Sequence, residues 1–136
     1  MKLGYAVSGF MSEDIVSLEI TETLGDAAKL MVDKEIGSVV VTDGSDMVGI
    51  LTERDVLKKF CFDARCADLK VGEVMSGPLV TIDGKASIGQ AADLMAEKKI
   101  RRLLVTVEDR IRGIITERDV MRATLDVFKK LSDAWI

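Results

Sequence analysis

An internal duplication constrains this chain more than any other feature of its sequence. The motif Gly-Ile-Leu-Thr-Glu-Arg-Asp-Val at residues 49–56 returns as Gly-Ile-Ile-Thr-Glu-Arg-Asp-Val at residues 113–120, and 113 − 49 gives an offset of 64 positions. At that offset, residues 7–58 align with residues 71–122 without a gap, and 20 of these 52 positions are identical. A unit of this size buries little apolar surface alone, so we expect two copies that pack as one pseudo-twofold domain.

The composition fits a compact domain and excludes several classes of partner. The chain has 136 residues, of which 48% are hydrophobic and only 4% aromatic, so the core is expected to consist of aliphatic side chains. The net charge of −4 disfavours nucleic acid and anionic membranes as partners, because both bind mainly through clustered Lys and Arg. No apolar run approaches about 20 residues and no signal peptide is visible, so we predict a cytoplasmic protein.

The hydrophobic periodicity predicts the same order of elements in both copies, namely strand, helix, strand, strand, helix. This order defines an α/β (α+β) fold class with two pseudo-twofold-related β-α-β-β-α repeats. In the first copy we expect strands at 16–18, 38–42 and 47–51, a helix from the N-cap Thr23 to a stop at Gly37, and a helix at 52–60. In the second copy we expect strands at 79–82, 101–107 and 111–115, a helix capped by Ser87, and a helix at 117–125. The boundaries predicted are repeat 1 at 7–60, a connector at 61–70, repeat 2 at 71–125 and a helical tail at 126–136.

Two segments outside the repeats have no assigned role. Residues 1–10 are interpreted as an arm that packs on its own or a neighbouring subunit. The tail places Val127, Phe128, Leu131 and Trp135 near one helical face, which indicates a partner surface.

The connector contains the two cysteines of the chain, Cys61 and Cys66, and histidine is absent. Two thiols provide at most half of a structural zinc site, so no metal site is predicted. We interpret the cysteines as free, partly packed thiols, with a disulfide as the alternative in an oxidising or hyperthermophilic setting. No nucleophile and base occur together, so no catalytic residue is predicted.

The repeated Thr-x-x-Asp pattern has a purely structural interpretation. A hydroxyl at the N-cap and a carboxylate three residues later form a variant capping box, which satisfies free amides at a helix start. The glycine before it can serve to bend the strand or to allow a close backbone approach.

Together, however, the two copies resemble the cystathionine β-synthase (CBS) domain family. In that family, Gly-hydrophobic-hydrophobic-Ser/Thr-x-x-Asp ends a β-α-β-β-α repeat, and the resemblance includes Met11-Ser12 and Met75-Ser76 at the repeat starts. It covers nearly the whole chain and looks like one tandem pair, called a Bateman module. Leu104 and Val40 depart from the family pattern, where Pro is frequent, as does Val107, where Asp is frequent.

The resemblance implies a regulatory module that binds an adenosine derivative in the cleft between paired repeats, with AMP as the favoured ligand. The motif Asp would hold the ribose hydroxyls, the motif Thr would lie near ribose or phosphate, and basic residues of the partner repeat would reach the phosphate. Site 1 would comprise Thr52, Asp55, Val80, Thr81, Ile82, Arg101, Arg102 and Arg118. Site 2 would comprise Val16, Ser17, Leu18, Ser38, Arg54, Thr116 and Asp119.

The two implied sites differ in charge. Site 1 has as many as three guanidinium groups and site 2 has one, so site 1 is expected to prefer phosphorylated ligands. Arg101 and Arg102 alternate along a strand and cannot both point to one side. We expect at least one to contact phosphate, while the alternative is surface charge or ion pairs with Glu97 or Glu108.

The alternative function is an interaction scaffold without a nucleotide ligand. In either case the family leads us to expect a homodimer of CBS pairs and allows a regulated protein partner. The apolar faces of Ala27, Ala28, Met31 and Met95 are assigned either to the core or to such an interface. The sequence does not distinguish AMP from ADP, ATP, S-adenosylmethionine or NAD.

Overall fold

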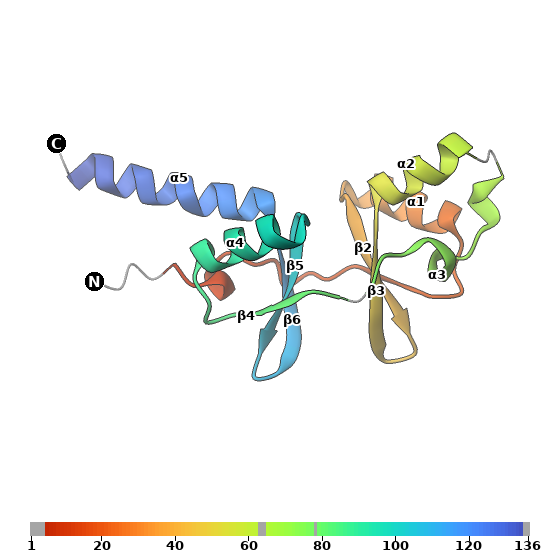
Figure 1. Ribbon diagram of the computed structural model, residues 1–136, viewed down its shortest axis with the longest axis horizontal. Helices are drawn as coiled ribbons and strands as arrows, with labels where there is room; N and C mark the ends of the chain where they lie inside the picture. Colours follow the sequence, from red (N-terminus) through yellow and green to blue (C-terminus); the bar gives the residue numbers. More distant parts are fainter. Residues whose placement is uncertain (1–4, 63–64, 78, 135–136) are drawn as a thin grey trace. The chain divides into compact units, whose positions relative to one another are not determined.

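The computed structural model describes residues 5–62, 65–77 and 79–134, and it divides into two compact units (Figure 1). We call Ile15–Leu79 the N-unit, and Met1–Asp14 together with Val80–Ile136 the C-unit. The N-unit contains β1 (Ser17–Glu19), α1 (Leu24–Lys34), β2 (Ser38–Asp43), β3 (Asp46–Thr52), α2 (Glu53–Phe62), η2 (Cys66–Asp68) and α3 (Val71–Val74). The C-unit contains η1 (Val7–Gly9), β4 (Thr81–Asp83), α4 (Ile88–Lys98), β5 (Arg102–Val107), β6 (Arg110–Thr116) and α5 (Glu117–Ala134).

Each unit has a three-stranded sheet whose central strand has one parallel and one antiparallel neighbour. The order is β1-β2-β3 in the N-unit and β4-β5-β6 in the C-unit. β1 is parallel to β2 through the crossover helix α1, and β2 and β3 form an antiparallel hairpin; β4, β5 and β6 repeat this arrangement. The predicted mixed α+β class and the strand-helix-strand-strand-helix order are therefore confirmed.

The cores of the two units consist largely of equivalent aliphatic side chains. The N-unit core includes Ala27, Met31 and Leu51, and the C-unit core includes Met95 and Ile115 among its buried residues. Ala27, Met31 and Met95, which the sequence assigned either to the core or to an interface, thus belong to the core, while Ala28 is half-buried.

The crossover helices begin as predicted. The Thr23 hydroxyl accepts a hydrogen bond from the Asp26 amide at 3.1 Å, and the Asp26 carboxylate accepts one from the Thr23 amide at 3.1 Å. Ser87 and Gln90 form the same capping box at α4. The hydrogen bonds from Thr23 lower the pKa of Asp26, while hydrogen bonding to Asp26 and repulsion from it raise the pKa of Glu22.

The end of the first crossover helix is not where we predicted it. Gly37 was expected to stop this helix, but α1 ends at Lys34, and Glu35 adopts the left-handed conformation with φ of 54°. The Glu35 amide donates to the Val32 carbonyl and the Ile36 amide to the Met31 carbonyl, so the last turn closes without glycine. Lys99 ends α4 in the same way, with φ of 56°.

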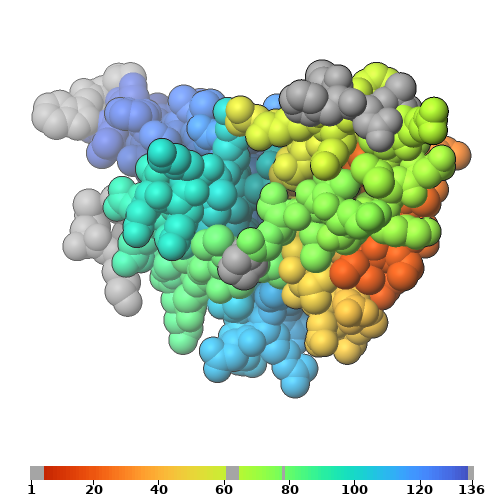
Figure 2. Space-filling model, turned by 45° about the vertical axis from the view of Figure 1, so that its right-hand side comes forward, coloured from red at the N-terminus to blue at the C-terminus, as the bar shows by residue number. Residues whose placement is uncertain are grey.

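The closing helix and the predicted tail form one continuous helix, α5, which continues beyond α4 and the sheet of its own unit (Figure 1). Its Val127 is half-buried, Phe128 and Leu131 are exposed, and Trp135 lies outside the described residues. The β5–β6 hairpin protrudes from the C-unit (Figure 2). Glu108 and Asp109, at its turn, have left-handed backbone, with φ of 53° and 62°.

Each unit is completed by a short docking segment. In the C-unit this segment is residues 5–12, and in the N-unit it is residues 69–76, which correspond at the 64-residue offset. The Val7 amide donates to the Ala86 carbonyl at 2.8 Å, and the Val71 amide donates to the Glu22 carbonyl at 2.8 Å. Both valines are fully buried. The N-terminal arm is therefore part of the C-unit core, although it is far from that unit in the sequence.

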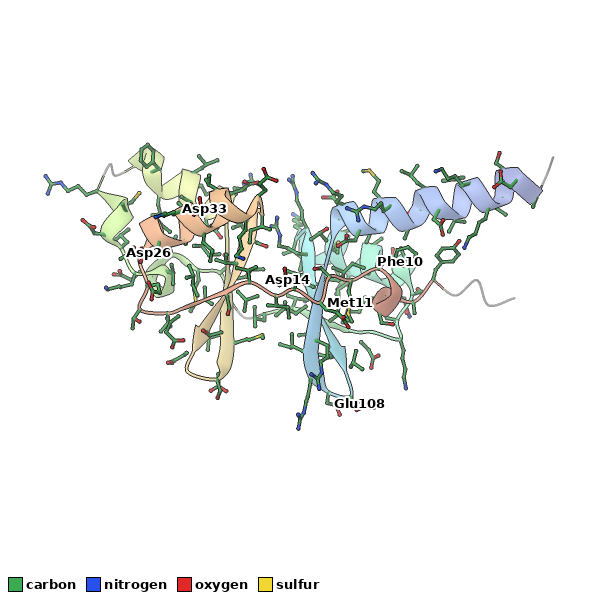
Figure 3. The ribbon with its side chains drawn as sticks, turned by 180° about the vertical axis from the view of Figure 1, so that it is seen from behind. Phe10, Met11, Asp14, Asp26, Asp33 and Glu108 are labelled. Atoms are coloured by element: carbon green, nitrogen blue, oxygen red, sulfur yellow. The ribbon has the colours of Figure 1, made fainter. Side chains whose placement is uncertain are left out.

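Each docking segment ends against the glycine of a repeated motif. In the C-unit, Ser12 and Ile114 exchange two hydrogen bonds of 2.9 Å, so Met11 and Ser12 lie against β6 at Gly113 (Figure 3). A Cβ atom on Gly113 would lie 2.5 Å from the Met11 sulfur and 2.8 Å from the Ser12 carbonyl oxygen. At Gly49, the corresponding distances to Met75 and Ser76 are 2.5 and 3.0 Å. The predicted close backbone approach thus explains these glycines.

Val7→Ala should destabilise the C-unit by about 2 kcal/mol, because it removes two methyl groups from a fully buried site. Hydrogen exchange should show the loss of protection in α4 and β5. Val71→Ala is the matched variant, and its effect should appear in α1 and β2 instead. Equal changes in both units for either variant would contradict the separate cores.

Gly113→Ala should lower the free energy of unfolding by about 1–3 kcal/mol, because the added methyl group meets the carbonyl oxygen of Ser12, a residue that two backbone hydrogen bonds fix to Ile114. Thermal or urea unfolding measures this change. Gly89→Ala in α4 is the control, because the added Cβ would meet no atom closer than 3.8 Å. This substitution should stabilise the folded chain slightly. An unchanged stability of Gly113→Ala would refute the close approach.

Candidate functional site

The two Thr-x-x-Asp pairs have the same geometry. Thr52 ends β3, and Asp55 lies in the first turn of α2. The Asp55 Oδ2 atom accepts hydrogen bonds from the Thr52 amide at 2.9 Å and from the Thr52 hydroxyl at 3.0 Å. The Asp55 amide in turn donates to the Thr52 hydroxyl oxygen at 3.2 Å. The predicted variant capping box is therefore present, and it fixes the carboxylate at the start of the helix.

The second pair repeats this arrangement at the start of α5. The Asp119 Oδ2 atom accepts from the Thr116 amide at 2.8 Å and from the Thr116 hydroxyl at 2.9 Å. Both aspartates are half-buried. Because Oδ2 takes both of the hydrogen bonds found among the described residues, Oδ1 of each carboxylate is left to accept further hydrogen bonds, such as those from hydroxyl groups.

The strand register brings three segments that carry predicted site residues to the same edge of each sheet. In the N-unit, Ser38 pairs with Thr52, and the Val40 amide donates to the Val16 carbonyl at 2.9 Å. The entry of β2, the end of β3 and the start of β1 thus meet at the same edge. In the C-unit, Arg102 pairs with Thr116, and the Leu104 amide donates to the Val80 carbonyl at 3.0 Å.

Each unit thus gathers one group of the predicted ligand-binding residues. The N-unit brings together Val16, Ser17, Leu18, Ser38, Thr52, Arg54 and Asp55. The C-unit brings together Val80, Thr81, Ile82, Arg101, Arg102, Thr116, Arg118 and Asp119. Both of the predicted sites draw residues from both units, so the assignment of these residues to site 1 and site 2 remains a prediction.

The edges of the two units differ in charge. The C-unit edge has Arg101, Arg102 and Arg118, where the N-unit has Gly37, Ser38 and Arg54. Arg101 and Arg118 are exposed, whereas Arg102 is half-buried. The difference between Arg101 and Arg102 agrees with their expected alternation along the strand. Leu104 and Val40, where the family often has proline, are buried and pair with Ile114 and Ile50, and each hairpin has a register shift shortly after them.

The ion-pair partner of Arg101 is not one that we predicted. Arg101 Nε lies 3.7 Å from Glu117 Oε2, rather than near Glu97 or Glu108. The Glu117 amide also donates to the Arg101 carbonyl at 2.8 Å, so the start of α5 holds the two residues together. Both side chains are largely exposed, at 73% and 65%, so the ion pair is weak and leaves the guanidinium accessible.

Other kinds of site find no support in the described part of the chain. Within it, no group of three His, Cys, Asp or Glu side chains could hold a metal ion. Cys66 is a free, buried thiol, and the side chain of Cys61 lies outside the description. No helix among these residues combines the length and the apolar character that are needed to cross a bilayer.

Sequence comparison matches both copies of the repeat to one known family. The profile of the CBS domain family matches residues 7–61 and again residues 71–126. The CBS domain-containing protein YhcV of Bacillus subtilis is 30% identical over 115 residues, which are 85% of this chain and 82% of the relative. The uncharacterized protein MJ1404 of Methanocaldococcus jannaschii is 32% identical over 139 residues. That match spans 90% of this chain but only 32% of the archaeal protein.

Solved structures share the whole fold. The CBS-domain containing protein ATU1752 of Agrobacterium tumefaciens has a TM-score of 0.84 and 27% identity, and the match covers 91% of this chain and 98% of that one. CBSX2 in complex with AMP has a TM-score of 0.75, 27% identity and the same two coverages. A hexameric CBS-CP12 protein from bloom-forming cyanobacteria has a TM-score of 0.77 and 28% identity, with coverages of 85% and 66%. With two family matches that together span most of its length, this chain belongs to the CBS domain family.

Proposed function

We propose that this chain is a non-catalytic regulatory module that binds an adenine nucleotide, with AMP as the favoured ligand. The observation that carries the proposal is the pair of fixed carboxylates at Asp55 and Asp119, each with one oxygen that is not used by its own threonine. A carboxylate in this state can accept hydrogen bonds from two neighbouring ribose hydroxyls. The structural relative CBSX2 is a complex with AMP, which supports an adenine nucleotide as the ligand class.

The flanking residues suit the other parts of a nucleotide. The amides at the start of a helix and the guanidinium groups at the C-unit edge attract phosphate. Strand entries lined by small or aliphatic side chains, such as Val16 and Val80, offer an apolar surface to adenine. As the sequence predicts, we propose that Thr52 and Asp55 share one ligand with Arg101, Arg102 and Arg118, and that Thr116 and Asp119 share another with Ser38 and Arg54.

The second candidate function is an interaction scaffold without a nucleotide. It is favoured by one specific observation: within the described residues, capping alone accounts for every side-chain hydrogen bond of both threonine–aspartate pairs. For either function we propose self-association and a cytoplasmic setting. Oligomers occur among structural relatives, as in the hexameric CBS-CP12 protein.

Asp55→Ala should weaken binding of AMP at the tighter site by about 10- to 100-fold, because it removes a charged acceptor of ribose hydroxyls. Asp119→Ala should spare that site, since the guanidinium-rich set is predicted to work with Asp55. Isothermal titration with AMP, ADP and ATP measures both affinities. Equal losses in the two variants would refute the predicted asymmetry.

A capping control separates ligand binding from helix stability. Asp26→Ala removes the equivalent carboxylate from the capping box of α1, which is outside the proposed sites. It should lower the melting temperature without changing nucleotide affinity. If the unmodified chain gives no binding heat with AMP, ADP, ATP, S-adenosylmethionine or NAD, that result would instead support the scaffold function.

A further inference from the structure

Two methionines occupy equivalent positions near the ends of the docking segments. Met11 belongs to the segment of the C-unit and Met75 to that of the N-unit, and each packs against the core of its unit. Both side chains are half-buried. Each thioether sulfur lies over the backbone of a motif glycine, at a place where it would be 2.5 Å from an added Cβ. The two copies of the repeat therefore use a sulfur atom for the same close contact.

The exposure of these methionines distinguishes them from others in the chain. Met31 and Met95, which are also equivalent in the two copies, are only 5% and 6% exposed. Met121 is 59% exposed on α5. Oxidants reach a thioether according to its exposure, and oxidation to the sulfoxide turns a flexible apolar side chain into a polar one. Met11 and Met75 combine partial exposure with a close contact that a change of the sulfur would disturb.

A sulfoxide fits this contact poorly in either orientation. Its oxygen is a polar acceptor, which is costly to bury without a hydrogen-bond donor. An oxygen that points toward the glycine meets a backbone contact already too close for a methyl group. An oxygen that points toward solvent requires the side chain to turn away, which leaves the space over the glycine empty. Both orientations weaken the docking of the segment on its hairpin.

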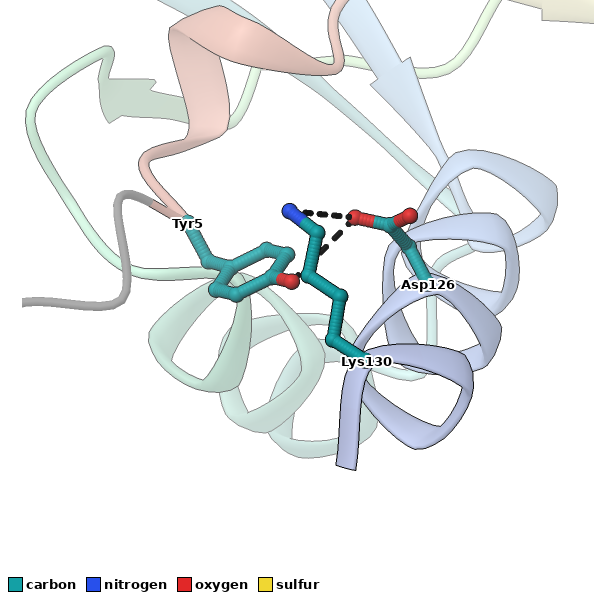
Figure 4. A network of polar contacts seen from close by, with 3 residues as sticks. All are labelled: Tyr5, Asp126 and Lys130. Carbon is teal, nitrogen blue, oxygen red and sulfur yellow. Dashed lines mark hydrogen bonds and ion pairs between the residues drawn. The ribbon is translucent and has the colours of Figure 1, made fainter. Parts of the chain in front are cut away.

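The first residue of each segment is held independently of the methionine. In the C-unit, the Ile88 amide donates to the Tyr5 carbonyl at 3.1 Å. In the N-unit, the Leu24 amide donates to the Leu69 carbonyl at 2.8 Å. The Tyr5 hydroxyl also donates to Asp126 Oδ2 at 3.2 Å (Figure 4). A segment that loses its methionine contact thus stays attached at its first residue and can dock again.

The methionine end of each segment leads into the repeated motif. Ser12, next to Met11, exchanges two backbone hydrogen bonds with Ile114, two residues before Thr116. Thr116 in turn holds the Asp119 carboxylate. The pairing at Ser76 has the same relation to the motif of the N-unit. A change at the methionine can therefore reach the threonine–aspartate pair through the backbone of one strand.

We propose that Met11 and Met75 are sites of reversible oxidation by peroxide, and that the sulfoxide loosens the methionine end of each docking segment. The thioether sulfur attacks one oxygen of hydrogen peroxide, so that an S–O bond forms and the O–O bond breaks. The sulfur loses two electrons, and the proton of the attacked oxygen passes to the leaving hydroxide, which becomes water. Methionine sulfoxide reductases reverse the change. This inference goes beyond the proposed function and does not depend on a nucleotide.

The first test follows the methionines of the folded, unmodified chain during treatment with hydrogen peroxide. Peptide mass spectrometry should find the added oxygen first at Met121, and then at Met11 and Met75. Met31 and Met95 should remain thioethers, because the cores exclude the oxidant. If Met11 and Met75 were oxidised only together with the two core methionines, the inference would be overturned.

Hydrogen exchange on the same samples measures whether the segments loosen. The amides paired between Ser12 and Ile114 should exchange on the order of tenfold faster once Met11 is oxidised. The pairing at Ser76 should respond in the same way to oxidation of Met75. Treatment with methionine sulfoxide reductases and a dithiol should restore slow exchange. Oxidation of both methionines with unchanged exchange would overturn the inference, and this experiment needs no variant.

The second test removes both sulfur atoms. The double variant Met11→Leu/Met75→Leu nearly conserves side-chain volume and leaves nothing to oxidise at these positions. Peroxide should lower the melting temperature of the unmodified chain by roughly 5 °C, and most of this fall should be absent from the double variant. Met121→Leu is the matched control, and its melting temperature should fall like that of the unmodified chain. Circular dichroism checks that each variant is folded before treatment.

The double variant also controls for other oxidisable groups, because it retains Cys61, Cys66 and Met47. An equal fall in melting temperature in the double variant and the unmodified chain would therefore assign the effect to those groups and overturn the inference. The single variants separate the units. Met11→Leu should confine the faster exchange to the N-unit, and Met75→Leu should confine it to the C-unit.

Discussion

The structure depends on the docking of a short segment into each unit, at a place where the two backbones come too close for any side chain. A β-α-β-β-α repeat has a three-stranded sheet and two helices, which leave one side of its small core open. Val7 and Val71 fill that side in their respective units, and the backbone pairings at Ser12 and Ser76 fasten the segments to the hairpin strands. The motif glycine is required here, because Met11 and Met75 occupy the space of its missing side chain.

The residues of the repeated Gly-x-x-Thr-x-x-Asp motif therefore have separate functions. The glycine serves the docking segment, and the threonine and aspartate serve the start of a helix and, in the function we propose, a ligand. This division explains why a motif of eight residues recurs with one change while the rest of the repeat has diverged. The capping hydrogen bonds hold each carboxylate in place with or without a ligand, so they serve the helix start and the proposed site alike.

The sequence predicted the local structure better than the distant contacts. Thr23 and Ser87 were identified as N-caps because capping depends on residues three positions apart. The helix stop at Gly37 was wrong, because Glu35 closes the helix with hydrogen bonds that overcome its unfavourable left-handed backbone. The arm could be recognised, but its place in the C-unit depends on contacts between residues about 80 positions apart. One sequence signal for this contact was available. The pair Met11-Ser12 recurs as Met75-Ser76, and the glycines that the two pairs contact, Gly113 and Gly49, recur as well.

The position of the docking segments has a consequence for biosynthesis. The N-unit, Ile15–Leu79, is contiguous and includes its own segment, so it can fold once that stretch has left the ribosome. The C-unit needs residues from both ends of the chain, and Val7 has no core to enter until α4 and the β5–β6 hairpin have been translated. Residues 5–12 are therefore made before the rest of their unit, and they can become ordered only after the β5–β6 hairpin has been translated.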